Sequence, residues 1–286
     1  MTGFATGWIP DTPDARDFTR AHDLVRPFLE RAGITGEPPE IPDAVDLAAD
    51  FPPVINQGVL NSCTAATAAA LVAYFQRRAH GRDLDPSTLF LYKVSRNLLG
   101  LRGDTGALLR TAMQGLRLFG VVPEIRWPSD AQNLDVEPPT FHYLYAANYK
   151  AKAYYRLDEP GLDRTLLLSR VRTGLAARLP AMFGLFLFPS VSFALEGAIP
   201  MPDSGERPQL SHALVAVGYD DAREVRNPLG GPQVRGALKV RNSWGPAWGA
   251  QGYGWLPYDY VLRGYTSDWW SLIEADFVDN GQFGVR

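Results

Sequence analysis

Cysteine is nearly absent from this 286-residue chain, which contains a single one, Cys63. One thiol cannot form an internal disulfide, so a disulfide-stapled scaffold is excluded and the hydrophobic core must stabilise the fold. Long apolar runs are lacking as well. The strongest, at 181–188, is far shorter than the roughly 18 to 20 residues of a membrane helix. The N-terminal stretch lacks the basic and apolar regions of a secretory signal peptide. We therefore expect a cytoplasmic protein or one exported by another route, without membrane insertion.

The chain has no excess of positive charge either, because it contains 28 Lys and Arg residues and 31 Asp and Glu residues. This balance gives no electrostatic footprint for nucleic acid. The four histidines are scattered, and the HExxH, P-loop and dinucleotide-binding glycine patterns are absent. We therefore predict no nucleic-acid partner, no metal and no cofactor. The composition is that of a soluble globular protein, and we expect a monomer.

The pattern of the chain changes near its middle, from helical periodicity to strand alternation, which predicts an α+β fold. The residues expected to be helical share apolar spacings of three and four, and they are 63–79, 86–98, 105–119 and 161–177. Strands are expected from about Tyr143 onward, with candidates at 180–187, 212–219 and 237–242. The polar stretch 220–235 is expected to be a long connection.

The first 40 residues differ from the rest because they combine several prolines with many charges. A short helix is expected at 21–32. The apolar residues Trp8, Ile9 and Phe18 indicate that this segment packs on the remainder of the chain, and disorder is the alternative. We expect a leader at 1–40 that lies over a cleft, followed by a domain at 41–286.

Cys63 begins an alanine-rich helical run that Gly81 should end. Asn61 or Ser62 would cap the start of this helix, which places the sulfur in its first turn. The positive end of the helix favours an anion there and lowers the pKa of a thiol. This pattern favours a reactive cysteine, although a buried structural cysteine remains the alternative.

Three further residues complete a nucleophilic site. His212 begins one apolar strand and Asn242 ends a second, inward-facing one. If the two strands pair, the asparagine could orient the imidazole as in a Cys-His-Asn triad. The side-chain N–H groups of Gln57, together with the backbone N–H of Cys63, could form an oxyanion hole. Taken singly, a histidine on a strand is a structural residue about as often as a functional one. An isolated glutamine usually lies on the surface. His22 and His80 stand in polar surroundings and His142 in an expected loop, so none of them is preferred as the base.

These residues stand in sequence blocks that resemble the papain-like cysteine peptidases. The blocks are 53–63 (PVINQGVLNSC), 211–219 (SHALVAVGY), 240–253 (VRNSWGPAWGAQGY) and 41–46 (IPDAVD), which is similar to the start of the family's mature chain. The resemblance implies a two-lobe fold, in which an active-site cleft separates a helical lobe (about 55–142) from an antiparallel β-barrel-like lobe (about 143–286). It also implies a peptide or protein substrate.

The resemblance assigns roles to particular residues. Cys63 would be the nucleophile, His212 the general base and acid, Asn242 the orienter and Gln57 the oxyanion donor. Trp244 would shield the His212–Asn242 hydrogen bond from water. The residues implied to line the substrate cleft are Gly106, Gly184, Ser211, Ala213 and Trp248.

The chain also departs from the family pattern. Leu60 replaces a disulfide cysteine, Asn61 a glycine and Thr64 a tryptophan. The long family pro-domain is missing, and the leader motif at 7–17 is similar to one in bacterial relatives. The resemblance implies an endopeptidase acting through a Cys63 thioester. The alternatives are an acyl transferase, peptide ligase or cyclase that uses the same thioester, and a catalytically silent binding relative.

Overall fold

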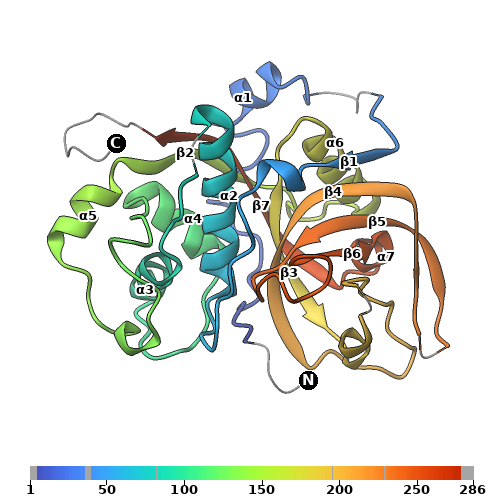
Figure 1. Cartoon of the computed structure of the whole chain (residues 1–286). Helices are drawn as coiled ribbons and strands as arrows, with labels where there is room; N and C mark the ends of the chain where they lie inside the picture. The colour runs from blue at the N-terminus through green and yellow to red at the C-terminus, as the bar shows by residue number, and fades with distance from the viewer. Residues whose placement is uncertain (1–4, 36–39, 82, 195, 229, 278–286) are drawn as a thin grey trace.

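The helices fall into two groups in the computed structural model, which describes residues 5–35, 40–81, 83–194, 196–228 and 230–277. The α-helices are α1 (Arg26–Arg31), α2 (Cys63–His80), α3 (Thr88–Leu98), α4 (Leu109–Leu118), α5 (Thr140–Ala146), α6 (Arg164–Ala176) and α7 (Tyr258–Leu262). Short 3₁₀ turns are Ala48–Asp50, Ala131–Asn133 and Pro189–Phe193. Figure 1 shows α2 to α5 on the left, while α6 and α7 lie with most of the sheet on the right.

One antiparallel sheet contains all the named strands. These are β1 (Ala44–Asp46), β2 (Tyr149–Arg156), β3 (Ala181–Leu187), β4 (Leu210–Arg226), β5 (Gln233–Arg241), β6 (Tyr253–Pro257) and β7 (Thr266–Phe277). The order is β2-β7-β3-β4-β5-β6, with β1 paired to β4. In the described part of the chain β2 and β6 do not pair, so the sheet is open rather than closed into a barrel. The molecule thus has the α+β, two-lobe architecture that the resemblance implied.

The long helix α2 forms where the sequence analysis places it. Alanine and long side chains favour the helix, and nearly all its residues from Cys63 to Phe75 are buried against α3 and β4. It ends at Gly81, whose backbone is left-handed (φ 65°) and whose N–H donates to the Arg77 carbonyl at 2.8 Å. The burial of α2 between the two lobes holds its first residue at the junction between them.

Polar side chains define the starts of two other helices. The Ser87 hydroxyl accepts a hydrogen bond from the Phe90 N–H at 3.0 Å at the start of α3. The Asp163 carboxylate accepts from the N–H groups of Thr165 and Leu166 at the start of α6. Each bond satisfies a backbone donor that the helix itself leaves free, which explains the positions of both helix starts.

Two elements differ from the sequence-based expectations. Residues 220–226 and 233–235, expected in a polar connection, extend β4 and β5 into a long ribbon in which Val225 pairs with Val234. Both faces of this ribbon carry polar side chains, so the apolar alternation that marks a strand is missing. Thr140–Ala146 forms α5, where a loop at His142 and strands from Tyr143 were expected. Packing of Tyr145 and Ala146 in the core overrides the strand preference of the aromatic residues.

The N-terminal segment packs on the rest of the molecule between residues 5 and 35. Trp8, Val25 and Leu29 are buried, and Phe18 stacks on Tyr154 with ring centroids 5.4 Å apart. The helix expected at 21–32 is shorter than expected, since α1 covers only Arg26–Arg31. Disorder is therefore excluded for the described part of this segment.

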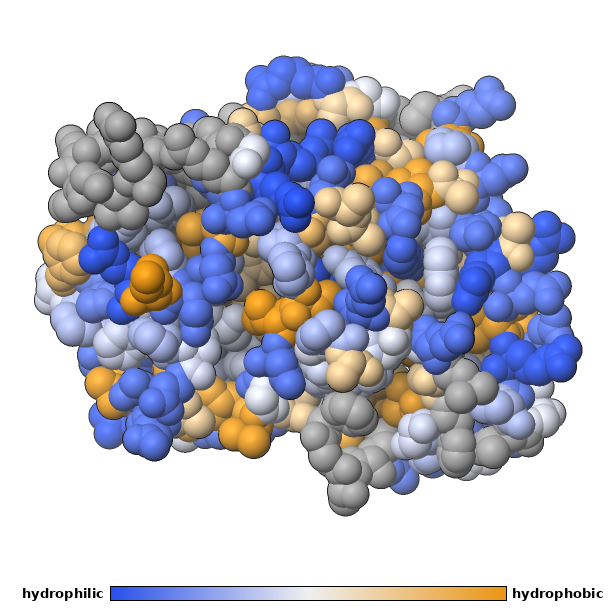
Figure 2. All heavy atoms as spheres, in the orientation of Figure 1, coloured by the Kyte–Doolittle hydropathy of each residue, from blue (hydrophilic) through white to orange (hydrophobic). Residues whose placement is uncertain are grey.

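Polar and charged side chains cover most of the face shown in Figure 2, and the apolar ones form small separate patches. Over the described residues, no helix combines the length and the apolar character needed to cross a bilayer.

Candidate active site

Cys63 lies at the first position of α2 and is fully buried. Ser62 is the N-cap residue, but neither it nor Asn61 caps the helix through its side chain. The Asn61 amide instead donates to the Asp104 carboxylate at 3.1 Å. The backbone N–H of Cys63 points at the carbonyl oxygen of Thr6, 3.4 Å away. The helix start is thus occupied by the N-terminal segment rather than by a capping side chain.

The expectation of a lowered thiol pKa is wrong for this conformation. Burial raises the pKa of Cys63 to about 12, and the backbone N–H groups of Ala213, Trp8 and Thr64 only partly oppose this shift. The helix terminus still faces the sulfur, but removal from water raises the thiol pKa by more than the amide dipoles lower it. Because Trp8 belongs to the N-terminal segment and Ala213 to β4, the sulfur lies where α2, β4 and that segment meet.

His212 and Asn242 are hydrogen-bonded to each other. The His212 Nε2 atom lies 2.8 Å from the Asn242 Oδ1 atom. Strands β4 and β5 place them, since Val215 pairs with Arg241 just before Asn242. Oδ1 also accepts from the Ser243 N–H at 2.7 Å, which fixes the carboxamide. Within the described chain, His212 Nδ1 has no hydrogen-bond partner, so this nitrogen is free to exchange a proton.

Trp244 covers the imidazole of His212. The two rings are stacked, with centroids 4.4 Å apart and planes inclined by 22°. Trp248 meets Trp244 edge-on at 5.8 Å. Burial lowers the pKa of His212 to about 4, and the hydrogen bond to Asn242 only partly opposes this shift. The imidazole is therefore neutral at neutral pH in this conformation, as is the Cys63 thiol.

Gln57 and Cys63 present two hydrogen-bond donors to one carbonyl oxygen. The Gln57 Nε2 atom lies 3.3 Å from the Thr6 oxygen, and the Cys63 backbone nitrogen lies 3.4 Å from the same atom. The Gln57 amide is held from both ends, since Nε2 donates to the Leu60 carbonyl at 2.8 Å and Oε1 accepts from the Ser243 hydroxyl at 2.5 Å. This fixed pair of donors can bind an oxygen that gains negative charge.

The residues expected to line a substrate cleft lie mostly against the N-terminal segment. A Cβ atom on Gly106 would overlap the Gly7 carbonyl, and one on Gly184 would overlap the Trp8 ring. The Ser211 hydroxyl donates to the Trp8 carbonyl at 2.6 Å. Ala213 contributes its backbone N–H beside the sulfur, whereas Trp248 packs on Trp244.

Residues 7–9 run along the cleft and form an isolated parallel bridge between Trp8 and Ala107. The Ala107 N–H donates to the Gly7 carbonyl at 2.9 Å, and the Ile9 N–H donates to the Ala107 carbonyl at 3.0 Å. A cavity of about 600 Å³ remains open beside this segment, between Asn61 on the helical side and Phe186 on the sheet side. The cleft between the lobes is therefore filled at its centre and open along one flank.

The sequence analysis missed two carboxylates at the site. Asp104 accepts from the backbone and side-chain N–H groups of Asn61 and from the Tyr92 hydroxyl. Asp268, on β7, accepts from the indole N–H of Trp8 at 3.0 Å. No local motif marks either residue. A charged residue directly before the strand-like run at 269–272 is the sequence signal that points to Asp268.

The chain is similar to cysteine proteases of the papain family. The family model described as "Papain family cysteine protease" matches residues 190–261. An uncharacterized peptidase C1-like protein of Acanthamoeba polyphaga mimivirus is 31% identical over 285 residues, which cover 94% of this chain and 86% of that protein. Cathepsin K of Gallus gallus is 27% identical over 209 residues, 70% of this chain and 54% of its own length.

A solved structure is similar over almost the whole chain. It is the crystal structure of xylellain, a cysteine protease from Xylella fastidiosa, with a TM-score of 0.73 and 29% sequence identity. The match covers 94% of this chain and 96% of that one. The similarity therefore extends through both lobes and most of the N-terminal segment.

Proposed function

This chain belongs to the papain family of cysteine proteases, and from that premise we propose that it hydrolyses peptide bonds through a thioester on Cys63. Membership makes the chain a papain-like cysteine peptidase, and the roles of single residues are the proposal. Gln57 and the Cys63 N–H carry it, because together they already hold a carbonyl oxygen, that of Thr6. A substrate carbonyl in this place would lie beside the sulfur.

The proposed reaction begins when His212 Nδ1 takes the thiol proton and the Cys63 sulfur attacks the substrate carbonyl carbon. The resulting oxyanion accepts hydrogen bonds from the Gln57 side chain and the Cys63 N–H. The imidazolium then gives its proton to the departing amine, the C–N bond breaks and a thioester remains. Water attacks the thioester with His212 as base, which releases the acid and restores the thiol. Asn242 holds the imidazole through Nε2 and leaves Nδ1 for these transfers.

We further propose that residues 1–40 form an inhibitory leader for a peptidase domain at 41–286. The described part of the leader places Thr6 at the oxyanion donors and Trp8 beside the sulfur. With the leader in place, the pKa of Cys63 is raised to about 12 and that of His212 is lowered to about 4. Proton transfer from sulfur to imidazole is then strongly unfavourable. Departure of the leader would rehydrate both groups and restore their reactivity.

The test uses the full chain and internally quenched peptides, with mass spectrometry of the products. We expect slow cleavage by the wild type, limited by the fraction of molecules from whose cleft the leader has departed. Cys63→Ala should show none, while Ser62→Ala, its neighbour in the chain, should cleave as the wild type does. Peptide cleavage by Cys63→Ala at the wild-type rate would overturn the proposal. An added amine such as glycinamide separates the alternatives, because an acyl transferase would give the amide product instead of the acid. A silent relative would show no turnover even when the leader is weakened.

A further inference from the structure

The side chain of Trp8 fills a pocket in the sheet lobe next to Cys63. Only 1% of Trp8 is exposed. Its indole lies against Gly184 on β3, where any Cβ atom would overlap the ring, and against Phe186 at a centroid distance of 5.3 Å. Because Gly184 leaves room for a flat ring, the pocket is shaped for a large aromatic side chain.

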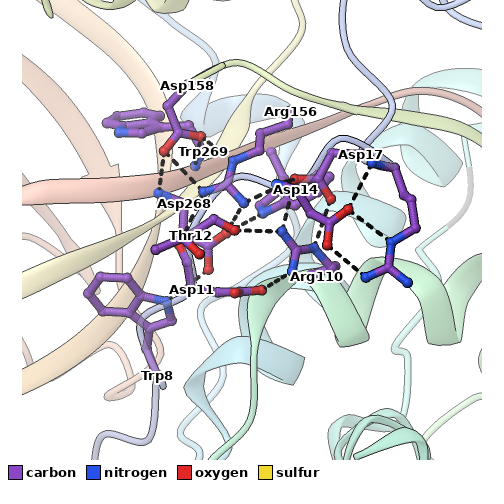
Figure 3. Close-up of polar contacts among 12 residues, drawn as sticks. Trp8, Asp11, Thr12, Asp14, Asp17, Arg110, Arg156, Asp158, Asp268 and Trp269 are labelled. Atoms are coloured by element: carbon purple, nitrogen blue, oxygen red, sulfur yellow. Dashed lines mark hydrogen bonds and ion pairs between the residues drawn. The ribbon is translucent and has the colours of Figure 1, made fainter. Parts of the chain in front are cut away.

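A carboxylate closes the far end of this pocket. Asp268 is fully buried, and its Oδ2 atom accepts the hydrogen bond from Trp8 Nε1 at 3.0 Å. Its Oδ1 atom accepts from Trp270 Nε1 at 2.6 Å. Asp268 also has a left-handed backbone (φ 61°), unusual for a residue other than glycine. Figure 3 shows the Trp8 indole pointing at Asp268 from the cleft side.

Asp268 has a counter-charge inside the protein, which it shares with two other carboxylates. Arg156 Nη1 lies 3.3 Å from Asp268 Oδ1, and this guanidinium is itself 1% exposed. Arg156 also pairs with Asp158 at 2.9 Å and with Asp17 of the leader at 3.4 Å. In Figure 3 these groups form one cluster, in which Arg110 also pairs with Asp17. The group that the structure seats against Asp268 Oδ2 is a neutral hydrogen-bond donor, the indole N–H of Trp8.

The pocket opens directly onto the reactive centre. The Trp8 backbone N–H lies beside the Cys63 sulfur, and the Trp8 carbonyl accepts from the Ser211 hydroxyl at 2.6 Å. Any peptide that takes the place of the leader in the cleft therefore has one side chain over this pocket. If that side chain carries no donor, Asp268 Oδ2 keeps its burial and loses its partner, which is unfavourable.

We propose that Asp268 determines substrate specificity, selecting peptides that place a large aromatic side chain with a terminal N–H donor, tryptophan first, in the pocket vacated by Trp8. This inference rests on the proposed peptidase function and names its substrate class. A site built around a hydrogen bond discriminates strongly against a ligand that lacks the donor, because the buried acceptor is left unpaired.

The test compares peptides that differ in one side chain. A single position carries tryptophan, 3-benzothienylalanine (sulfur in place of the indole N–H) or phenylalanine, and it is moved through the three positions on the acyl side of the cut. The full chain is used at pH 8, because burial raises the pKa of Asp268 to about 7. The leader competes equally with every peptide, so it cancels from ratios of kcat/KM.

At one of these positions we expect kcat/KM for tryptophan to exceed that for 3-benzothienylalanine by about tenfold or more. Asp268→Leu should bring the ratio close to one. Ser211→Ala, which alters only the bond to the Trp8 backbone, should leave the ratio unchanged whatever it does to the overall rate. Equal rates for the two isosteres at all three positions, or a preference for arginine or lysine over tryptophan, would overturn the inference.

A second measurement does not need catalysis. Trp8→Phe, Asp268→Asn and the double variant form a cycle read by thermal unfolding of the full chain. We expect Trp8→Phe to lower Tm clearly less in the Asp268→Asn background than in the wild type. Additive shifts would overturn the pairing on which the inference depends. Absence of all peptide cleavage would instead count against the proposed function, while the cycle still reports on Trp8 and Asp268.

Discussion

Replacing Trp8 by alanine should expose Cys63 to solvent without unfolding the protein. The Trp8 side chain is 1% exposed in the closed cleft, and it would be hydrated once the leader leaves. The substitution therefore destabilises the closed conformation selectively. Removal of a buried tryptophan side chain costs about 3 to 5 kcal/mol. Since about 1.4 kcal/mol corresponds to a tenfold change in an equilibrium constant, the open fraction should rise by about 100-fold to 4,000-fold.

Alkylation of the single cysteine measures this fraction directly. Iodoacetamide reacts with Cys63 only when the sulfur is accessible, so the rate of mass gain of the intact chain follows the open population. Leu24→Ala is the matched control, because Leu24 is also an apolar leader residue but is 48% exposed. We expect a rise of about 100-fold to 4,000-fold for Trp8→Ala and none for Leu24→Ala.

The outcome is interpretable only if the variant remains folded at the assay temperature, which its thermal unfolding curve shows. An alkylation rate within about twofold of wild type in a folded Trp8→Ala protein would refute the reasoning. It would mean that Trp8 contributes little to closure, despite its burial and its bond to Asp268.

Gly7→Ala should also open the cleft, because Gly7 has φ 116° and an added Cβ would overlap the Asn61 carbonyl; an unchanged alkylation rate would show that the segment can shift to make room. Gln57→Ala should lower kcat by about 10² to 10³-fold with little change in KM, as loss of one oxyanion donor does; a KM effect alone would indicate a binding role. His212 is held neutral, with a pKa of about 4 against the ordinary 6.5, so its contribution to stability is present above pH 6.5 and is lost as the pH falls towards 4. That contribution is about 3 kcal/mol. The measurement is the free energy of unfolding as a function of pH, in the wild type and in His212→Leu. Asp268 titrates in both proteins, so its contribution cancels from the difference between the two curves. Parallel curves would contradict the prediction.

Much of the fold could be predicted because its signals are local. The helix from Cys63 to Gly81 follows from a run of helix-favouring residues and a left-handed glycine stop, both readable within about twenty residues. Strands β3 and β4 follow from short apolar runs at 181–187 and 212–219. The ribbon of β4 and β5 beyond residue 220 was missed, because a solvent-facing two-stranded ribbon need not alternate apolar and polar residues.

The sequence by itself determined which reactive groups this protein has and in which elements they lie: a thiol at a helix start, an imidazole and a carboxamide on neighbouring strands. Only the tertiary structure decided the state of those groups. Burial raises the pKa of Cys63 to about 12 in the closed cleft, where the Trp8 backbone lies beside the sulfur. The Trp8 indole is in turn bonded to Asp268, 260 residues away in the chain. Desolvation is set by every atom that excludes water from a group. Contacts between residues so far apart therefore reverse what the helix terminus alone predicts.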